Sequence, residues 1–591
     1  MAWNKVEISA CSVVFVRALI VVVGVLCGAL VASVAQAQVV RDPAEQRRDL
    51  ERDNAEQRRA QERDAIQREQ NLPQRDVRLD TPQTASTQPL PQDEMPCFAI
   101  REIRLSGEDA QRFAWVLGEL GGPNGQDGPL QRCLGAKGAG VVMERAQSAL
   151  TARGFVTSRV LVETQELAQG RLVLTTMAGR IRHIRFEDPQ QLRTPSWKSA
   201  LPVRPGDVLN LREVEQALEN FKRLPTADVD IQVESADQPF ESDLVISWRQ
   251  GLPLRLNLSV DDSGAKSTGR YQSSVTLSLD SPFGLNDLLY VGVQTDLGGG
   301  DPGRRGTSGH SLHYSVPWGK QLLAIDLSDS RYFQSIAGLV QDYTYRGNST
   351  SQSLSLSRLL YRDAVHKSTL QLQAFARQSR NFIDDTEVEV QRRRVGGWQI
   401  GVEHHALVGA GTLELGLGVR RGTGAFGSLP APEEVFGEGT SRFALVLADI
   451  RWQQAFHLGT QPWRYNSQWR GQANRTPLSP QERFAIGGRY SVRGFDGESS
   501  LSAERGWSLR NELSTPLGDS GQSVFLGLDH GEVSGPYADF LIGKRLTGAV
   551  LGLRGGIGPM QYEVFAGWPL RKPEGFRTAH MTAGFWLAAS F

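Results

Sequence analysis

The chain has 591 residues, with 65 lysines and arginines against 65 aspartates and glutamates, so its formal net charge is zero. This balance gives no reason to expect nucleic-acid binding, and the length is sufficient for several domains. The 62 glycines, together with many short alternating runs, favour β-rich structure in the second half.

Residues 1–37 have the features of a secretory signal peptide. A basic leader with Lys5 and Arg17 is followed by an apolar run from Ala18 to Val34 and a small-x-small cleavage site, Ala35-Gln36-Ala37. The alternative is a membrane anchor, because the run approaches the length of a spanning helix. No later run has that length, so an exported chain of this kind could enter a membrane only as a closed barrel.

Arginine, glutamate, glutamine, aspartate and alanine dominate residues 38–70. Mixed charges at three- and four-residue spacing predict a solvated helix, which without an apolar face must be tethered or sit in a polar cavity. The alternative is a disordered charged leader. Residues 71–96 contain five prolines and predict an extended linker.

Two cysteines remain outside the leader, Cys97 and Cys133. An isolated pair in an exported segment most simply forms a disulfide. On the chain-entropy estimate, closing its loop of roughly 35 residues contributes about 3–4 kcal/mol. Two thiols without nearby histidines do not make a zinc site, so we expect no metal.

The next two segments, 97–179 and 180–250, each predict a small α/β module. The first reads as one strand (98–105), two helices (110–120 and 141–152) and two further strands (158–162 and 171–174). The second predicts a helix near 189–201 and an amphipathic helix over 211–221. One face of that helix carries Leu211, Val214, Leu218 and Phe221.

From residue 251 to residue 591 the pattern changes to long strands with a period of two. Any half-exposed antiparallel sheet shows such alternation, but about sixteen runs of uniform length favour a membrane barrel with an even number of strands. We therefore predict an all-β transmembrane barrel of about 16 antiparallel strands, preceded by two α/β modules and an N-terminal helix.

The connections between these strands alternate between short and long. Pro-Gly turns at 281–284, 316–319 and 515–518 follow even-numbered strands, whereas longer segments such as 423–440 and 475–504 lie on the opposite side. The last strand ends the chain on Phe591, which resembles the assembly signal of outer-membrane barrels. A soluble β-sandwich could end in the same way by chance.

The segment 475–504 contains Val492-Arg493-Gly494-Phe495 in a loop framed by glycines. A partly desolvated guanidinium is costly without a partner, so Arg493 suggests an internal lock rather than a surface charge. The alternative is an exposed loop arginine. Gly487, Gly488 and Gly494 would permit a tight backbone path, or they are ordinary turn glycines.

These features resemble the TpsB family of two-partner secretion transporters, which belongs to a BamA-related superfamily. The order of a leading helix, a linker, two POTRA modules (97–179 and 180–250) and a sixteen-strand barrel is similar over nearly the whole mature chain. The motifs that carry the resemblance are Cys97-Phe98-Ala99-Ile100, Gly206 to Leu211, Leu224-Pro225 and Val492 to Phe495. The last is shared with BamA-like insertases, whereas two POTRA modules behind a charged helix favour the secretion branch.

The resemblance also implies an inward-facing aspartate on the thirteenth strand that holds the loop arginine. In the matching segment, Phe525, Gly527, Asp529 and Gly531 share one face by two-residue spacing. This assigns the role to Asp529. A bidentate pair between the guanidinium of Arg493 and the carboxylate of Asp529 would fix the loop geometry, and a lysine could not form such a pair.

By this resemblance the protein is a non-enzymatic transporter of the bacterial outer membrane, with its POTRA modules in the periplasm. It would capture an unfolded TpsA-type exoprotein by β-augmentation, using strand 227–233 and the helix residues Leu211, Val214, Leu218 and Phe221. Passage through the pore would use no ATP, and residues 38–70 would plug the pore at rest. The other expected partners are the barrel-assembly machinery and outer-membrane lipid.

No hydrolase, zinc-protease or P-loop motif is present, so we expect no catalytic residue and no cofactor. The alternatives are a barrel-assembly factor of the BamA type, a porin or adhesin, and an outer-membrane enzyme such as a phospholipase.

Overall fold

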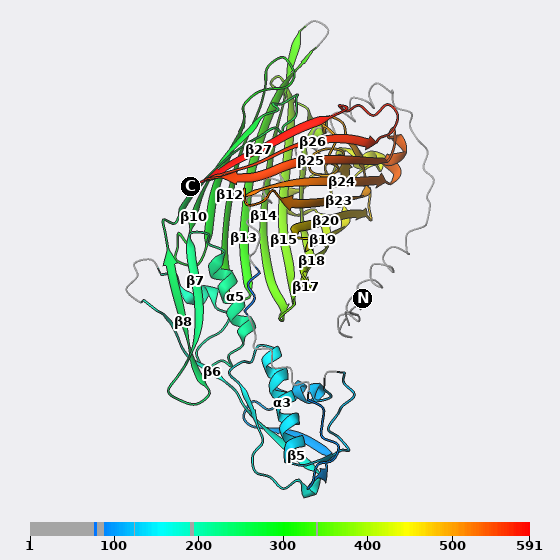
Figure 1. Ribbon diagram of the computed structural model, residues 1–591. Helices are drawn as coiled ribbons and strands as arrows, with labels where there is room; N and C mark the ends of the chain where they lie inside the picture. The colour runs from blue at the N-terminus through cyan, green and yellow to red at the C-terminus, as the bar shows by residue number, and fades with distance from the viewer. Residues whose placement is uncertain (1–75, 80–87, 123, 189–193, 338–340) are drawn as a thin grey trace. The chain divides into compact units, whose positions relative to one another are not determined.

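A computed structural model describes residues 76–79, 88–122, 124–188, 194–337 and 341–591 (Figure 1). The predicted signal peptide and plug helix lie outside these residues. Within these ranges, no helix combines the length and the apolar composition needed to cross a membrane. The described chain forms two α/β modules followed by a closed barrel.

In the first module a three-stranded sheet packs against helix α3 (Ala136–Ala152). The sheet order is β2 (Glu102–Ser106), β5 (Arg171–Met177) and β4 (Arg159–Leu161), with β2 parallel to β5. The predicted strand 98–105 is divided, because β1 (Phe98–Ala99) pairs with β3 (Cys133–Leu134) before the chain moves to β5. Ile100, at the break, is fully buried.

The predicted first helix is only a 3-10 helix, η1 (Ala114–Glu119), and α3 begins five residues before the predicted start at 141. Gly138 and Gly140 in its first turns weaken the helical pattern of the sequence. Glu94 stabilises the early start: its carboxylate accepts hydrogen bonds from the backbone of Gly135 (2.9 Å), Lys137 (2.6 Å) and Gly138 (2.9 Å).

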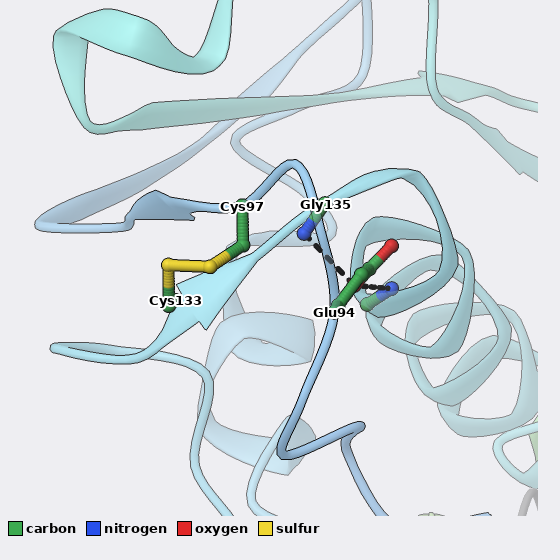
Figure 2. Close-up of a disulfide and its surroundings, with 5 residues drawn as sticks. Glu94, Cys97, Cys133 and Gly135 are labelled. Carbon is green, nitrogen blue, oxygen red and sulfur yellow. Dashed lines mark hydrogen bonds between the residues drawn. A yellow bond between two sulfur atoms is a disulfide. The ribbon is translucent and has the colours of Figure 1, made fainter.

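Figure 2 shows the neighbouring disulfide between Cys97 and Cys133, whose Cα atoms are 5.1 Å apart. The bond lies next to the β1–β3 pairing, and the side chain of Glu94 points to the helix start at Gly135. The disulfide and the carboxylate together attach the end of the linker to the first module.

The second module repeats the arrangement with β6 (Arg180–Phe186), β8 (Glu241–Gln250) and β7 (Ala227–Ser235), in that sheet order. Helix α4 (Trp197–Ala200) is short, and α5 (Leu211–Lys222) begins where the side chain of Asn210 accepts a hydrogen bond from Arg212 N at 2.8 Å. Strand β7 pairs only with β8, so it forms an edge of the sheet.

The barrel is a closed antiparallel sheet whose strands lie side by side in Figure 1. The described residues contain sixteen full strands, and a two-residue strand β16 (Thr386–Glu387) extends one hairpin. The first strand, β9, pairs with the last, β27, and closes the sheet. The strands are β9 (Leu254–Asp261), β10 (Gln272–Asp280), β11 (Leu288–Asp296), β12 (Arg305–Trp318), β13 (Gln321–Ala337), β14 (Asp342–Arg362), β15 (His366–Ile383), β17 (Arg393–Val408), β18 (Gly411–Thr423), β19 (Ala444–Leu458), β20 (Gln461–Asn474), β23 (Arg505–Pro516), β24 (Gln522–Ser534), β25 (Arg545–Ile557), β26 (Met560–Arg571) and β27 (Thr582–Ser590).

The predicted alternation sorts side chains between the two faces of this sheet. On β24, the thirteenth full strand, Leu526 and Leu528 are 56% and 52% exposed, whereas Asp529 is fully buried. The segment between the eleventh and twelfth strands, 475–504, forms a short hairpin of β21 (Phe484–Ile486) and β22 (Leu501–Ala503) and packs against the inward face.

Candidate functional site

The loop motif Val492-Arg493-Gly494-Phe495 lies buried against the inner wall of the barrel. The guanidinium of Arg493 forms a fork on Asp529: Nε donates to Oδ2 at 2.8 Å and Nη2 donates to Oδ1 at 2.9 Å. The backbone N–H of Arg493 also donates to Oδ2 at 2.9 Å. Two charges withdrawn from water are therefore paired with near-ideal geometry.

A second carboxylate, Glu512, completes the site and was missed by the sequence reasoning. Its Oε2 accepts from Arg493 Nη1 at 2.7 Å, and its other oxygen accepts from Arg554. Arg510 lies 3.9 Å from Asp529, so positive and negative charges alternate across the wall. A signal was available: Arg510 and Glu512 are two residues apart on one strand, which places both charges on one face.

Glycines on three neighbouring strands make room for the loop. A Cβ at Gly527 on β24 would lie 2.5 Å from Arg493 Nη2, and one at Gly567 on β26 would lie 2.8 Å from Gly494 Cα. A Cβ at Gly548 on β25 would overlap the carbonyl oxygen of Arg493. Gly494 itself has a φ of +99°, which L side chains rarely adopt. We call Gly527, Gly548 and Gly567 the glycine track.

Apolar packing holds the two ends of the motif. Val492 is fully buried and approaches Gly531, where a Cβ would lie 3.0 Å from Val492 Cγ2. Phe495 packs edge-on against Phe576, with ring centroids 5.7 Å apart. Phe525 is 2% exposed and reaches the charged group through Arg554, whose guanidinium lies 4.2 Å from its ring centroid.

A second buried charged group joins the linker, the second module and the barrel. Arg362, at the end of β14, pairs with Glu215 (3.0 Å) and Glu219 (2.9 Å) of α5, and Lys367 of β15 pairs with Glu219 at 2.6 Å. The side chains of Glu215 and Arg362 are 0% and 2% exposed. We call Glu215, Glu219, Arg362 and Lys367 the linker clamp.

The clamp holds four residues of the predicted linker, 76–79. The backbone N–H groups of Val77 and Leu79 donate to Glu219 (3.0 Å) and Glu215 (2.9 Å), and the carbonyl of Val77 accepts from Arg362. Asp76 pairs with His405 of β17 at 2.8 Å. Burial raises the pKa of Asp76, but hydrogen bonds from His405 and Arg78 outweigh it and hold the pKa below its usual range.

The structure corrects the predicted partner contacts on α5. Leu211, Val214, Leu218 and Phe221 are 7%, 2%, 0% and 0% exposed, and the last three belong to the core of the second module. Apolar side chains at helical spacing here pack a core and are unavailable to a partner. The polar face of the helix is also covered, because Glu215 and Glu219 belong to the clamp. The edge of β7 stays open.

Phe591 lies beside the first barrel strand, with backbone hydrogen bonds of 3.0 Å and 2.9 Å to Leu256, and its side chain is 66% exposed. In the described part of the chain, no group of three or more histidine, cysteine, aspartate or glutamate side chains is placed to hold a metal ion.

Comparisons with known families agree with this architecture. Residues 241–555 match the family described as haemolysin secretion/activation protein ShlB/FhaC/HecB. Residues 98–179 match the ShlB-type POTRA domain, and residues 180–234 match a further POTRA domain.

Individual proteins are similar over most of the chain. The outer membrane transporter CdiB-2 of Burkholderia pseudomallei (strain 1026b) is 37% identical over 567 residues, which is 93% of each chain. The solved structure of CdiB from Acinetobacter baumannii superposes with a TM-score of 0.79 at 30% identity, covering 94% of this chain and all of that one. The solved structure of CdiB from Escherichia coli superposes with a TM-score of 0.76 at 24% identity and the same coverage, which shows a similar fold.

Proposed function

Because this chain belongs to the haemolysin secretion/activation family ShlB/FhaC/HecB, the outer-membrane transporters of two-partner secretion, we propose that it exports a TpsA-type exoprotein as an extended chain through its own barrel. The barrel lies in the outer membrane, with the POTRA modules in the periplasm. The observation that carries the proposal is the buried group of Arg493, Asp529 and Glu512, which holds the loop 475–504 against the inner wall.

In the resting state, this buried group keeps the pore of the barrel closed. Moving the loop would separate Arg493 from both carboxylates and leave charges unpaired in a poorly hydrated place. Loss of one partner of a buried ion pair costs about 3–5 kcal/mol. An open state therefore needs compensation, and the passenger chain supplies it by filling the lumen with its own polar backbone. The wide bore of a sixteen-strand barrel suits an extended polypeptide.

Capture takes place on the edge of β7 (Ala227–Ser235). This strand pairs with β8 alone, so its other side offers backbone donors and acceptors to an incoming strand. Val233 is 36% exposed beside that edge. Backbone pairing of this kind suits an unfolded passenger, since it requires an extended segment and little sequence specificity.

Transport proceeds without ATP in this proposal. The sequence contains no P-loop, and folding of the passenger outside the cell prevents its return. Residues 38–70 serve as the plug, a proposal that rests on their sequence. The linker clamp lies between that segment and the first module, so it limits how far the plug moves.

The test is co-expression of the chain with a candidate TpsA-type exoprotein, followed by assay of the culture medium. The exoprotein should reach the medium only when the transporter is present. Depleting the transporter should leave the assembly of other outer-membrane barrels unchanged. A general loss of barrel proteins, with the exoprotein still secreted, would favour a barrel-assembly factor instead.

A further inference from the structure

Three arginines face outward on adjacent strands of the barrel: Arg331 on β13, Arg346 on β14 and Arg380 on β15. Along β13, Arg331 lies on the same face as Leu323, Ile325 and Leu327, which are 40%, 37% and 41% exposed. This is the lipid face of the barrel. We call the three arginines the outer arginine cluster.

Strand register brings the cluster together. Arg331 is opposite Asn348, which is opposite Arg380. Two residues further along, Arg346 lies between Phe333 and Phe382. Each arginine is therefore a diagonal neighbour of the next, at about 7–8 Å between Cα atoms. Like charges at this spacing repel one another unless an anion lies between them.

The cluster has little compensating charge among the described residues. Arg331 has no ion pair or side-chain hydrogen bond there. Arg346 pairs with Asp385 at 3.1 Å, whose side chain is 98% exposed, and its guanidinium lies 5.1 Å from the ring centroid of Phe382. Arg380 donates two hydrogen bonds, at 2.6 and 2.7 Å, to the side-chain oxygen of Gln378, which is neutral, when the amide of Gln378 is turned so that its oxygen faces the guanidinium. Two carboxylates beside the cluster have other partners. Asp329 of β13 is paired with His310 at 3.2 Å, and Glu387 of β16, which lies opposite Phe382, is paired with Arg392 at 2.6 Å.

Two members of the cluster, Arg331 and Arg346, line a cavity of about 640 Å³, and Arg380 lies outside its lining. The walls also include Arg304, Phe333, Phe382 and one carboxylate, Asp296, which accepts hydrogen bonds from the backbone of Gly298 (3.0 Å) and Thr307 (2.8 Å). Arg331 lies ten residues after Gln321, where β13 begins beside a short turn. A tilted strand crosses the membrane in about 9–11 residues, so the cavity lies at the outer headgroup level. Phenylalanines at this level match the aromatic girdle of membrane barrels.

We propose that the outer arginine cluster binds the phosphorylated sugar headgroup of an outer-leaflet glycolipid, of the lipid A class. Guanidinium groups bind phosphate in a bidentate manner, and three of them match the two phosphates of such a lipid. The acyl chains then lie along the apolar residues below, including Leu327 and Leu354, which are 41% and 49% exposed. A free phosphate would gain nothing from that apolar surface. The bound lipid anchors β13–β15 at a fixed depth.

Native mass spectrometry of the full chain in detergent, titrated with bisphosphorylated lipid A, tests this proposal. The variant R331Q/R346Q/R380Q should bind about tenfold more weakly or worse, since it loses three charge-assisted contacts. The control R101Q/R204Q/R249Q, with the same charge change in exposed residues of the periplasmic modules, should bind like the native chain. Equal binding by the cluster variant would overturn the proposal.

Two further arms separate the possible ligands. Lipid A without phosphates should bind as weakly to the native chain as the intact lipid binds to the cluster variant. Inorganic phosphate in excess should leave lipid A bound; displacement by phosphate alone would make this a free-anion site and refute the lipid. If the triple variant fails to fold, Arg331→Gln alone is informative, because it removes no ion pair or side-chain hydrogen bond within the described chain. It should weaken binding several-fold, and unchanged binding would contradict the proposal.

Discussion

The carboxylate of Asp529 binds Arg493 three times, through Nε, Nη2 and the backbone N–H, at 2.8, 2.9 and 2.9 Å. One side chain of the barrel wall therefore fixes both the charge and the backbone of the loop that lies inside it. The contact joins residues 36 positions apart, one in the loop and one on a barrel strand. The consequences for secretion can be tested at single residues.

Arg493→Lys should reduce secretion by about tenfold or more while the barrel still inserts. Lysine keeps the charge but cannot form the fork, so Asp529 and Glu512 would share one ammonium. Secretion into the medium and heat-modifiable mobility of the barrel measure the two effects. Arg475→Lys, an exposed arginine of the same loop segment, is the control. Secretion at the native level by Arg493→Lys would show that the fork is dispensable.

Gly548→Ala should displace the loop and raise the single-channel conductance in planar bilayers. The added methyl group would overlap the carbonyl oxygen of Arg493, and backbone cannot yield as a flexible side chain can. Gly556→Ala on the same strand is matched, since its Cβ would lie 3.5 Å from the nearest atom, Met560 O. Equal conductance in both variants would contradict the glycine track.

Arg362→Met should loosen the linker clamp. It would leave Glu215 and Glu219 buried with one fewer cation, a change that costs about 3–5 kcal/mol. Limited proteolysis within residues 71–96 should become faster in this variant. Arg358→Met, an exposed arginine of the same strand, should leave the cleavage rate unchanged. If both variants are cleaved like the native chain, the clamp does not hold the linker.

Replacing Cys97 and Cys133 by serine should destabilise the first module by about 3–4 kcal/mol on the chain-entropy estimate for a separation of 36 residues. Calorimetry of the full chain in detergent should show the loss as a lower unfolding temperature of this module. A reducing agent should reproduce it in the native chain and change nothing in the serine variant. An effect of the reductant on that variant would point to another cause.

A photo-crosslinking amino acid at Val233, on the edge of β7, should capture the passenger during secretion, because an added strand would lie within reach. The matched position is His183 on β6, the opposite edge of the same sheet, whose side chain is 65% exposed. Crosslinks at His183 without crosslinks at Val233 would move the capture site to the other edge.

Local pattern alone determined much of this protein. The period of two along each strand predicted about sixteen barrel strands, and it put Asp529 on one face with Phe525, Gly527 and Gly531. That this face points inward on the thirteenth strand came from the family resemblance, and the structure has Asp529 there. Such predictions succeed because the backbone of a strand directs successive side chains to opposite faces, whichever strands lie beside it.

Prediction from local pattern failed where the apolar face of an element could pack either in its own core or against a partner. The helix over 211–221 has one apolar side, and the pattern could not tell a partner-binding surface from the core that α5 fills with Leu218 and Phe221. Likewise, the start of α3 depends on Glu94, which lies 41 residues before Gly135 in contact with it.

What only the tertiary structure decided are the partners of charges far apart in the chain. Arg362 meets Val77 across 285 residues, because the linker packs against α5 and the end of β14. Glu512 meets Arg554 across 42 residues, because β23 and β25 lie on either side of β24. A sequence states which residues need a partner, since a buried charge is costly alone. The packing of distant segments determines which partner each one receives.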